Sequence, residues 1–421
     1  MLNSKVKKAA IRLPLLTAMM ILAACGNDSN NNDNTANQPD VPHQENNTTL
    51  GRLVITNSDS ANPMAYVYDL DDQKLASELP LKSVPNAVYS SPDHRYAVLI
   101  ARADNITKFV DGGIYQHDDH IDKDKPALLP LALTGPTPNH YRSFNGQAAI
   151  FYDGSDSLTS SFDLLTDNSL KSGKVVAYQP LPQKHHGVAE PRGNYVLSSY
   201  LAAGETTLSK LALYELHNDH FHFEKQFATD CSKLHGAGSN QDYSAFGCED
   251  GVLVVQQKNN EFADYKIPVN VRITTIAGHS KLKQFVAFAT GNLQAFVIDP
   301  VAKTSRELDW SAGIKDAEGK PVARLQHVMD QTGQHLVIMD NTGNLHVIET
   351  ATWTHKASIK VLDKDVSLGK ISLNASTNDI LVSDATAKAI HVVSLRDLKI
   401  SQKITLDFAP ANFAWVGVKK A

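Results

Sequence analysis

Short runs of alternating apolar and polar residues recur along the chain from about residue 50 onward, and residues that favour turns close each run. Runs of this kind begin at Ala65, Gly251, Gly291, Gly343 and Lys388. Alternation with a period of two indicates half-buried β-strands, and the Val, Ile, Tyr and Phe residues that dominate the runs favour strands. Because this part of the sequence shows no long helical periodicity, we expect an all-β fold.

A second, more apolar type of strand precedes these runs. Its seven copies begin at Tyr96, Ala148, Tyr195, Tyr243, Phe285, Leu336 and Asp379. Repeats spaced by roughly 40 to 50 residues are typical of four-stranded propeller blades. The stretch from Arg52 to Leu81 is an eighth, incomplete unit, and the tail from Phe408 supplies one strand to complete it. We therefore predict a single β-propeller domain over residues 50–421, with eight blades, or seven as the alternative.

The first residues are predicted to be a targeting signal rather than part of this fold. Residues 1–24 combine a cationic start with an apolar stretch too short for a permanent membrane helix, which predicts a signal peptide. The residues Leu22, Ala23, Ala24 and Cys25 resemble a bacterial lipobox, which implies cleavage before Cys25 and lipidation of its thiol. A plain signal peptide is the alternative. The residue after Cys25 is Gly26, whereas Asp at this position would favour retention in the inner membrane. We therefore expect an anchor in the inner leaflet of the outer membrane, facing the periplasm.

Composition, net charge and cysteine count limit what the chain can fold into and bind. Residues 25–49 are rich in Asn and Asp and cannot bury enough surface to fold, so they should form a disordered tether. The net charge of −5 over 421 residues provides no basic patch for nucleic acid. Besides Cys25, the chain has Cys231 and Cys248, an even pair for which a disulfide is expected in an oxidising compartment, with a metal site as the alternative.

Histidine recurs at one position of the repeat. Eight or nine residues before the second strand of four repeats stands a histidine: His140, His186, His235 and His327. Because the innermost strand of each blade faces the central channel, these imidazoles could converge there on a zinc ion. His140, His186 and His235 come from consecutive repeats, whereas His327 would reach across only a narrow channel. The alternative is that polar side chains lining the channel hold water.

Two further histidine groups lie outside this register. His117, Asp118, Asp119 and His120 form a polar loop within the second blade, which could bind a metal or could be a solvated acidic loop. In the stretch that begins at His217, alternation places His220 and His222 on one face. Weak metal capture is possible there, and exposed hairpin residues are the alternative.

Three segments carry a resemblance to a known family: "LTGPTPNHYRSFNGQAAIFYDG", "HHGVAEPRGNYVLSS" and "CSKLHGAGSNQDYSAFGCEDGVLVV". They resemble the periplasmic zinc metallochaperones of the AztD type. The resemblance implies a propeller of about eight blades with Zn²⁺ held by histidines near its channel, here His140, His186 and His235. It also implies a Cys231–Cys248 disulfide, a metal-binding element at His117–His120, and transfer of zinc to the solute-binding protein of a zinc ABC transporter. The lipobox and Glu190 are departures from the family pattern.

The sequence therefore favours a monomeric zinc carrier, and not an enzyme. One alternative is a metal-dependent, lactonase-like propeller hydrolase, for which Glu190 or Asp153 could serve as the general base. The other is a scaffold that binds proteins and no metal, because the propeller fold alone does not define a function.

Overall fold

The computed structural model describes residues 48–420. The predicted signal peptide, the lipidation at Cys25 and nearly all of the tether lie outside this range. Thr49, assigned to the end of the tether, is buried, and its hydroxyl donates a hydrogen bond of 2.5 Å to Asp71. Among the described residues, no helix is long and apolar enough to cross a membrane.

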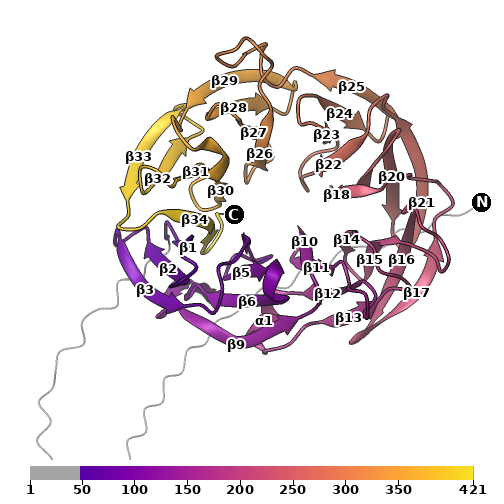
Figure 1. The fold of residues 1–421 in the computed structure, drawn as a ribbon, viewed down its shortest axis with the longest axis horizontal. Coiled ribbons are helices and arrows are strands. Elements are labelled where there is room, and N and C mark those ends of the chain that lie inside the picture. Colours follow the sequence, from indigo (N-terminus) through magenta and orange to yellow (C-terminus); the bar gives the residue numbers. More distant parts are fainter. Residues whose placement is uncertain (1–47, 421) are drawn as a thin grey trace, which may run out of the picture. The chain divides into compact units, whose positions relative to one another are not determined.

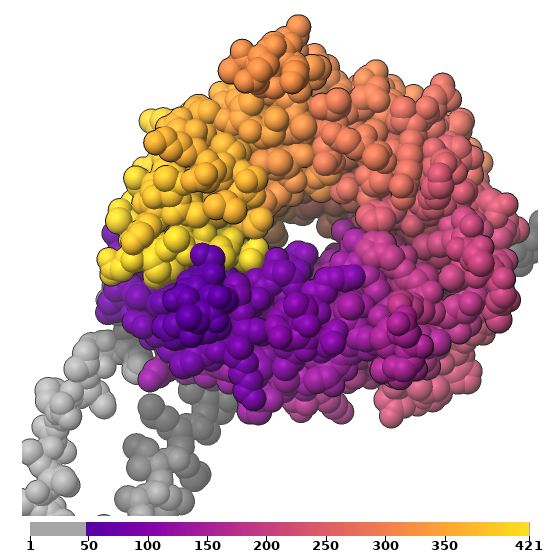
Figure 2. All heavy atoms as spheres, viewed as in Figure 1, coloured from indigo at the N-terminus to yellow at the C-terminus, as the bar shows by residue number. Residues whose placement is uncertain are grey.

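Eight four-stranded antiparallel sheets stand in a ring around a central opening (Figures 1 and 2). The prediction of an eight-bladed all-β propeller is confirmed. We number the blades by position along the chain, and each blade runs from its innermost to its outermost strand. Blade 1 contains β34 (Pro410–Val416), β1 (Arg52–Asn57), β2 (Met64–Asp69) and β3 (Lys74–Pro80). Blade 2 contains β4 (Ala87–Ser90), β5 (Tyr96–Ala101), β6 (Ile106–Asp111) and β9 (Ala127–Thr134).

The remaining blades each use four consecutive strands. Blade 3 contains β10 (Pro138–Phe144), β11 (Gln147–Tyr152), β12 (Ser161–Leu165) and β13 (Ala177–Pro180), and blade 4 contains β14 (Ala189–Arg192), β15 (Tyr195–Tyr200), β16 (Lys210–His217) and β17 (His220–Gln226). Blade 5 contains β18 (His235–Ser239), β19 (Tyr243–Cys248), β20 (Gly251–Lys258) and β21 (Glu261–Pro268), and blade 6 contains β22 (Ile273–Ala277), β23 (Phe285–Ala289), β24 (Ala295–Asp299) and β25 (Thr304–Leu308). Blade 7 contains β26 (Arg324–Met329), β27 (His335–Asp340), β28 (Asn344–Glu349) and β29 (Thr354–Lys360), and blade 8 contains β30 (Ile371–Asn374), β31 (Asp379–Asp384), β32 (Ala389–Ser394) and β33 (Lys399–Thr405).

The two ends of the described chain close the ring. Strand β34 pairs with β1, so the last strand becomes the innermost strand of the first blade, as the sequence predicts. Trp415 in β34 is fully buried, and its indole N–H donates a hydrogen bond of 2.8 Å to the carbonyl of Leu50. The apolar second strands are buried over nearly their whole length, and β5 and β19 are buried at every residue; these strands form the hydrophobic clusters between neighbouring blades.

The segment between β6 and β9 is more ordered than expected. A flexible polar loop is predicted there, but the structure forms a two-stranded hairpin of β7 (Ile114–His117) and β8 (His120–Lys123). Asp118 and Asp119 make the two-residue turn, and Asp118 has a φ of 49°, a left-handed conformation that Asp tolerates better than most residues. Alternation on the two short strands was the signal in the sequence for a hairpin.

Helices are few among the described residues. They comprise α1 (Asp167–Lys171) and two 3₁₀ turns, η1 (Arg102–Asp104) and η2 (Val366–Leu368). Thr166 caps α1, with its side chain accepting a hydrogen bond from the backbone N–H of Ser169.

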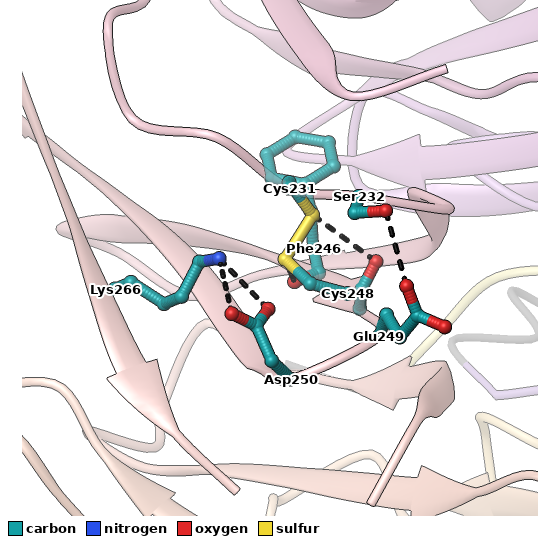
Figure 3. The surroundings of a disulfide bond; sticks show 8 residues. Cys231, Ser232, Phe246, Cys248, Glu249, Asp250 and Lys266 are labelled. Carbon is teal, nitrogen blue, oxygen red and sulfur yellow. Dashed lines mark hydrogen bonds and ion pairs between the residues drawn. A yellow bond between two sulfur atoms is a disulfide. The ribbon is translucent and has the colours of Figure 1, made fainter. Parts of the chain in front are cut away.

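Cys231 and Cys248 form a disulfide in blade 5 (Figure 3). The expected bond is present, and it does not join two strands of the blade. Cys248 ends β19, but Cys231 lies in the connection that precedes β18, so the bond fastens this connection to the blade. Both cysteines are fully buried in the cluster between blades 4 and 5. Beside the disulfide, Lys266 forms an ion pair with Asp250 at 2.7 Å (Figure 3).

Candidate metal centre

Three histidines from consecutive blades meet at the innermost strands of the ring. His140 lies in β10, His186 lies just before β14, and His235 begins β18. The Nε2 atom of His186 lies 3.2 Å from Nε2 of His140 and 3.1 Å from Nε2 of His235. One nitrogen from each ring lies within 4.8 Å of the other two. We call these residues the three-histidine cluster.

The spacing of the nitrogens suits a single tetrahedral ion. Two nitrogens bound to one zinc at ~2.0–2.1 Å lie about 3.3 Å apart when the geometry is tetrahedral. Both measured Nε2–Nε2 distances, 3.2 and 3.1 Å, are close to this value. The rings therefore require little movement to share a metal ion, and a fourth position remains open for water or for a ligand from another protein.

Hydrogen bonds on the far side of two rings fix which nitrogen can bind a metal. Nδ1 of His235 lies 2.8 Å from the carbonyl oxygen of Thr274, an acceptor, so Nδ1 carries the proton. Nδ1 of His186 lies 3.0 Å from Oδ2 of Asp153, a carboxylate that accepts its proton. With the proton on Nδ1, the lone pair of Nε2 points toward the centre of the cluster, as in the carboxylate–histidine–zinc arrangement.

Asp153 is itself held in place. Its Oδ2 accepts a hydrogen bond of 2.7 Å from Arg102, and the side chain is largely buried at the end of β11. Burial would raise the pKa of Asp153, but the hydrogen bonds from His186 and Arg102 outweigh burial and leave the pKa below its usual value. Asp153 therefore remains a carboxylate that orients His186. The sequence placed it only as a possible general base.

The backbone departs from regular strand geometry beside two of the three histidines. A β-bulge lies between Pro138 and Tyr141, around His140, and a second bulge lies between His235 and Ala237. Bulges re-aim the side chains next to them. In the second bulge Gly236 has a φ of +71°, and a Cβ there would stand 2.6 Å from the carbonyl oxygen of Thr274, so glycine is needed beside His235.

His185, the neighbour of His186, has a structural role. It is buried, and its Nε2 and Nδ1 atoms lie 3.0 Å from the Ser199 hydroxyl and from the Gln183 carbonyl oxygen. Gly187 packs so closely that a Cβ would stand 2.0 Å from the Ser199 hydroxyl oxygen. His185 and Gly187 thus anchor the segment on both sides of His186.

Burial keeps parts of the cluster neutral. It lowers the pKa of His140 to about 3, and the neighbouring His186 and His235 act in the same direction. Burial also lowers the pKa of His235. A neutral imidazole offers its lone pair to a metal without first losing a proton, so these rings are ready to bind at neutral pH.

His327 lies apart from the other three predicted ligands. Blade 7, which carries it, is four blades from blade 3, on the opposite side of an eight-bladed ring. Its ring packs against Phe288 with centroids 4.8 Å apart, and its Nδ1 lies 3.2 Å from the Arg324 guanidinium. Burial lowers its pKa to about 3. It lines a cavity of about 800 Å³, together with Arg324 and Lys370.

The β7–β8 hairpin brings together part of the second predicted group. His117, His120 and Asp122 each offer a ligand atom within 4.8 Å of the others, and we call them the hairpin cluster. His117 Nδ1 lies 3.0 Å from Asp122, and His120 Nδ1 lies 3.3 Å from Asp119. Asp118, in the turn, comes no closer than 3.9 Å to His117. Sequence reasoning missed Asp122, although the alternation of β8 places it on the same side as His120.

Glu190, noted as a departure from the family pattern, does not belong to the three-histidine cluster. It is fully buried in β14, and its Oε2 accepts a hydrogen bond of 2.9 Å from Arg142. The pair lies on the neighbouring innermost strands β14 and β10.

The fold and the cluster define a class: an eight-bladed β-propeller with three converging histidines on its innermost strands. No protein-family model matches the sequence. A curated relative, the zinc chaperone AztD of Citrobacter koseri, is 26% identical over 389 residues, which cover 88% of this chain and 87% of the relative. The similarity to the AztD type that the three sequence segments suggested is confirmed.

Solved structures show the same architecture. Apo AztD from Citrobacter koseri matches with a TM-score of 0.72 at 24% identity, over 87% of this chain and 98% of that one. A second crystal structure of Citrobacter koseri AztD matches with a TM-score of 0.71 at 24% identity, over 88% and 99%. The dihydro-heme d1 dehydrogenase NirN, at 13% identity, matches with a TM-score of 0.59 over 90% of this chain and 78% of that one. These structures support the fold.

Proposed function

We propose that the chain is a zinc carrier that holds Zn²⁺ through His140, His186 and His235 and releases it to another protein. The convergence of three Nε2 atoms at distances of 3.1 and 3.2 Å carries the proposal. The relative's description as a zinc chaperone supports the choice of zinc and of carriage. His327 stays a predicted fourth ligand, which would have to reach the ion from across the channel.

The acceptor in this proposal is the solute-binding protein of a zinc ABC transporter. A carrier must bind tightly and yet let its ion leave, and an ion with three protein ligands has an open position for an incoming ligand. His186 is partly exposed, with a side-chain exposure of 46%, so an acceptor ligand can approach the ion beside it. Transfer would then proceed by stepwise ligand replacement, with the hairpin cluster as an intermediate stop.

Carriage without catalysis fits the surroundings of the cluster better than hydrolysis does. A hydrolase needs a general base near the metal-bound water. Asp153 is occupied by His186 and Arg102, and Glu190 is paired with Arg142. Both candidate bases of the hydrolase alternative are therefore held as hydrogen-bond partners.

We also propose that the protein is a monomer anchored through a lipid on Cys25 in the inner leaflet of the outer membrane. The lipobox-like residues support this location. A Cys25→Ala variant should lose metabolic labelling with a fatty acid and should move from the membrane to the soluble fraction of the cell. Unchanged labelling would exclude lipidation at this cysteine.

The function is tested by replacing the three histidines together. The His140→Ala, His186→Ala, His235→Ala variant should lose its tightly bound zinc in equilibrium dialysis followed by elemental analysis. The zinc-loaded parent should load an apo solute-binding protein faster than zinc leaves the parent for a chelator of the same affinity. Transfer no faster than this dissociation would contradict carriage by direct handover.

A control variant should keep both properties. His355→Gln removes an imidazole from β29, the outermost strand of blade 7, a blade that contributes no residue to the three-histidine cluster. It should retain zinc and transfer if it folds, and its unfolding curve shows whether it does.

A further inference from the structure

The hairpin between β16 and β17, on the outer edge of blade 4, carries a second concentration of metal-binding side chains. Tyr214 and Phe221 are buried on one face, where they pack against blade 3. The other face carries only ligand-type residues around the turn. These are Glu215, His217, His220, His222 and Glu224, which we call the rim cluster.

Strand register explains the arrangement. Glu215 pairs with His222 and His217 pairs with His220, so these four side chains lie on the same face of the hairpin. A bulge between Leu213 and Tyr214 interrupts this alternation where Glu224 lies on the opposite strand. The ligand atoms of Glu215, His217 and Glu224 lie within 4.8 Å of one another.

Contacts within the rim cluster are as close as those in the three-histidine cluster. Nε2 of His220 lies 3.0 Å from Nε2 of His222, and the rings of His217 and His222 stack with centroids 4.3 Å apart. His217 Nε2 lies 3.1 Å from Oε2 of Glu215. The hydroxyl of Tyr195 donates a hydrogen bond of 3.1 Å to the other oxygen of Glu215 and so positions this carboxylate from behind.

Charge favours a cation at this place. Within residues 48–420, Glu215 makes its ion pair with His217, and neither Glu215 nor Glu224 pairs with a lysine or an arginine. The two carboxylates thus share one place with His217, and His222 and His220 lie beside it, with neither carboxylate paired to a fixed positive charge. Imidazole and carboxylate together suit borderline divalent ions such as Zn²⁺, Cu²⁺ and Ni²⁺.

We propose that the rim cluster is a separate site for a borderline divalent cation and that it fills independently of the three-histidine cluster. The proposal goes beyond the carrier function, because it rests on the outer hairpin alone. Its histidines are exposed, with side-chain exposures of 45% for His217 and 58% for His220. The ion there is therefore bound more weakly and exchanges faster than an ion at the three-histidine cluster, where His140 and His235 are half-buried.

The test uses the full chain with the two other clusters removed. In this background, His117, His120, His140, His186 and His235 are replaced by alanine, and Zn²⁺ alone is the probe. Titration should show about one zinc per chain, and the additional changes His217→Ala and His222→Ala should abolish it. A background that binds no zinc, or binding that survives the two additional changes, would overturn the proposal.

Blade 5 provides a matched control. Lys258 and Glu261 flank the turn between β20 and β21, as His217 and His220 flank the turn between β16 and β17. Lys258→Ala with Glu261→Ala should leave the rim zinc in place. The His217→Ala, His222→Ala pair in the otherwise unchanged chain should leave tight zinc binding and transfer intact, so failure of the rim proposal is distinguishable from failure of the carrier proposal.

Discussion

The three-histidine cluster and the hairpin cluster differ in the pKa values of their imidazoles. Burial lowers the pKa of His140 to about 3 and also lowers that of His235. A hydrogen bond to Asp119 raises the pKa of the exposed His120. An imidazole binds metal only after losing its proton, so a lowered pKa extends metal binding to lower pH and a raised pKa ends it at higher pH.

This difference predicts an order of release. As pH falls from about 7.5 to about 5.5, the hairpin cluster should lose zinc first, because His120 gains a proton before His140 and His235 do. Zinc per chain, measured after dialysis at each pH, gives the order when two variants that each keep one cluster are compared. Earlier loss from the three-histidine cluster would contradict this explanation.

Asp153 contacts His186, one of the proposed zinc ligands, so it would act on a bound ion through this ring. Asp153→Asn should lower zinc affinity by about 10- to 100-fold while all three ligands remain, since a neutral amide makes the imidazole less basic and less well oriented. Competition with a chelator measures the change. Asp156→Asn, at an exposed carboxylate of the following loop that pairs with Lys184, should have no effect. Equal effects of the two changes would show that Asp153 does not orient a ligand.

Among the elements, the disulfide secures the segment that leads to His235. Only three residues separate Cys231 from His235, and Cys248 ends the strand paired with β18. Closing a loop of this length contributes about 3 kcal/mol. Cys231→Ser with Cys248→Ser should lower the free energy of unfolding by about that amount in urea titrations. A reductant should destabilise the parent and leave the double variant unchanged, and the opposite pattern would contradict this role of the disulfide.

The strands could be predicted because their signal repeats. The start of each apolar second strand was predicted to within a residue, since a buried strand leaves a continuous run such as Tyr243–Cys248. The depth of a side chain in the channel could not be predicted in the same way. Counting back from the second strand assumes that the turn before it always has the same length. After β10 the turn consists of Asn145 and Gly146, whereas residues 330–334 separate β26 from β27. His327 therefore stands two residues before the end of its innermost strand, whereas His140 stands four residues before the end of β10.

The groups that hydrogen-bond to the proposed metal ligands could not be predicted from the sequence either. Asp153 follows β11, while the histidine it orients precedes β14, and nothing in their separation indicates a contact. The acceptor at Thr274 is a backbone carbonyl, which every residue has, so the sequence does not single it out. The glycines after His186 and His235 were a usable signal, because neighbouring atoms leave no room for a Cβ at either position.

At the scale of the whole molecule, ring closure is what brings His140, His186 and His235 together from consecutive repeats. Strand β34 joins the last residues of the propeller to β1, so every blade has a neighbour on both sides (Figure 1). The innermost strands then surround one opening, and side chains about 50 residues apart in sequence face a shared space. The outer edges of the same blades leave room for separate groups such as the rim cluster.

The central claim is that one zinc ion is bound by the three-histidine cluster. A crystal of the full propeller grown with Zn²⁺ and measured at the zinc absorption edge tests it directly. We expect an anomalous peak at ~2.0–2.1 Å from the Nε2 atoms of His140, His186 and His235. Zinc found at other sites while these three rings remain without a shared peak would contradict it.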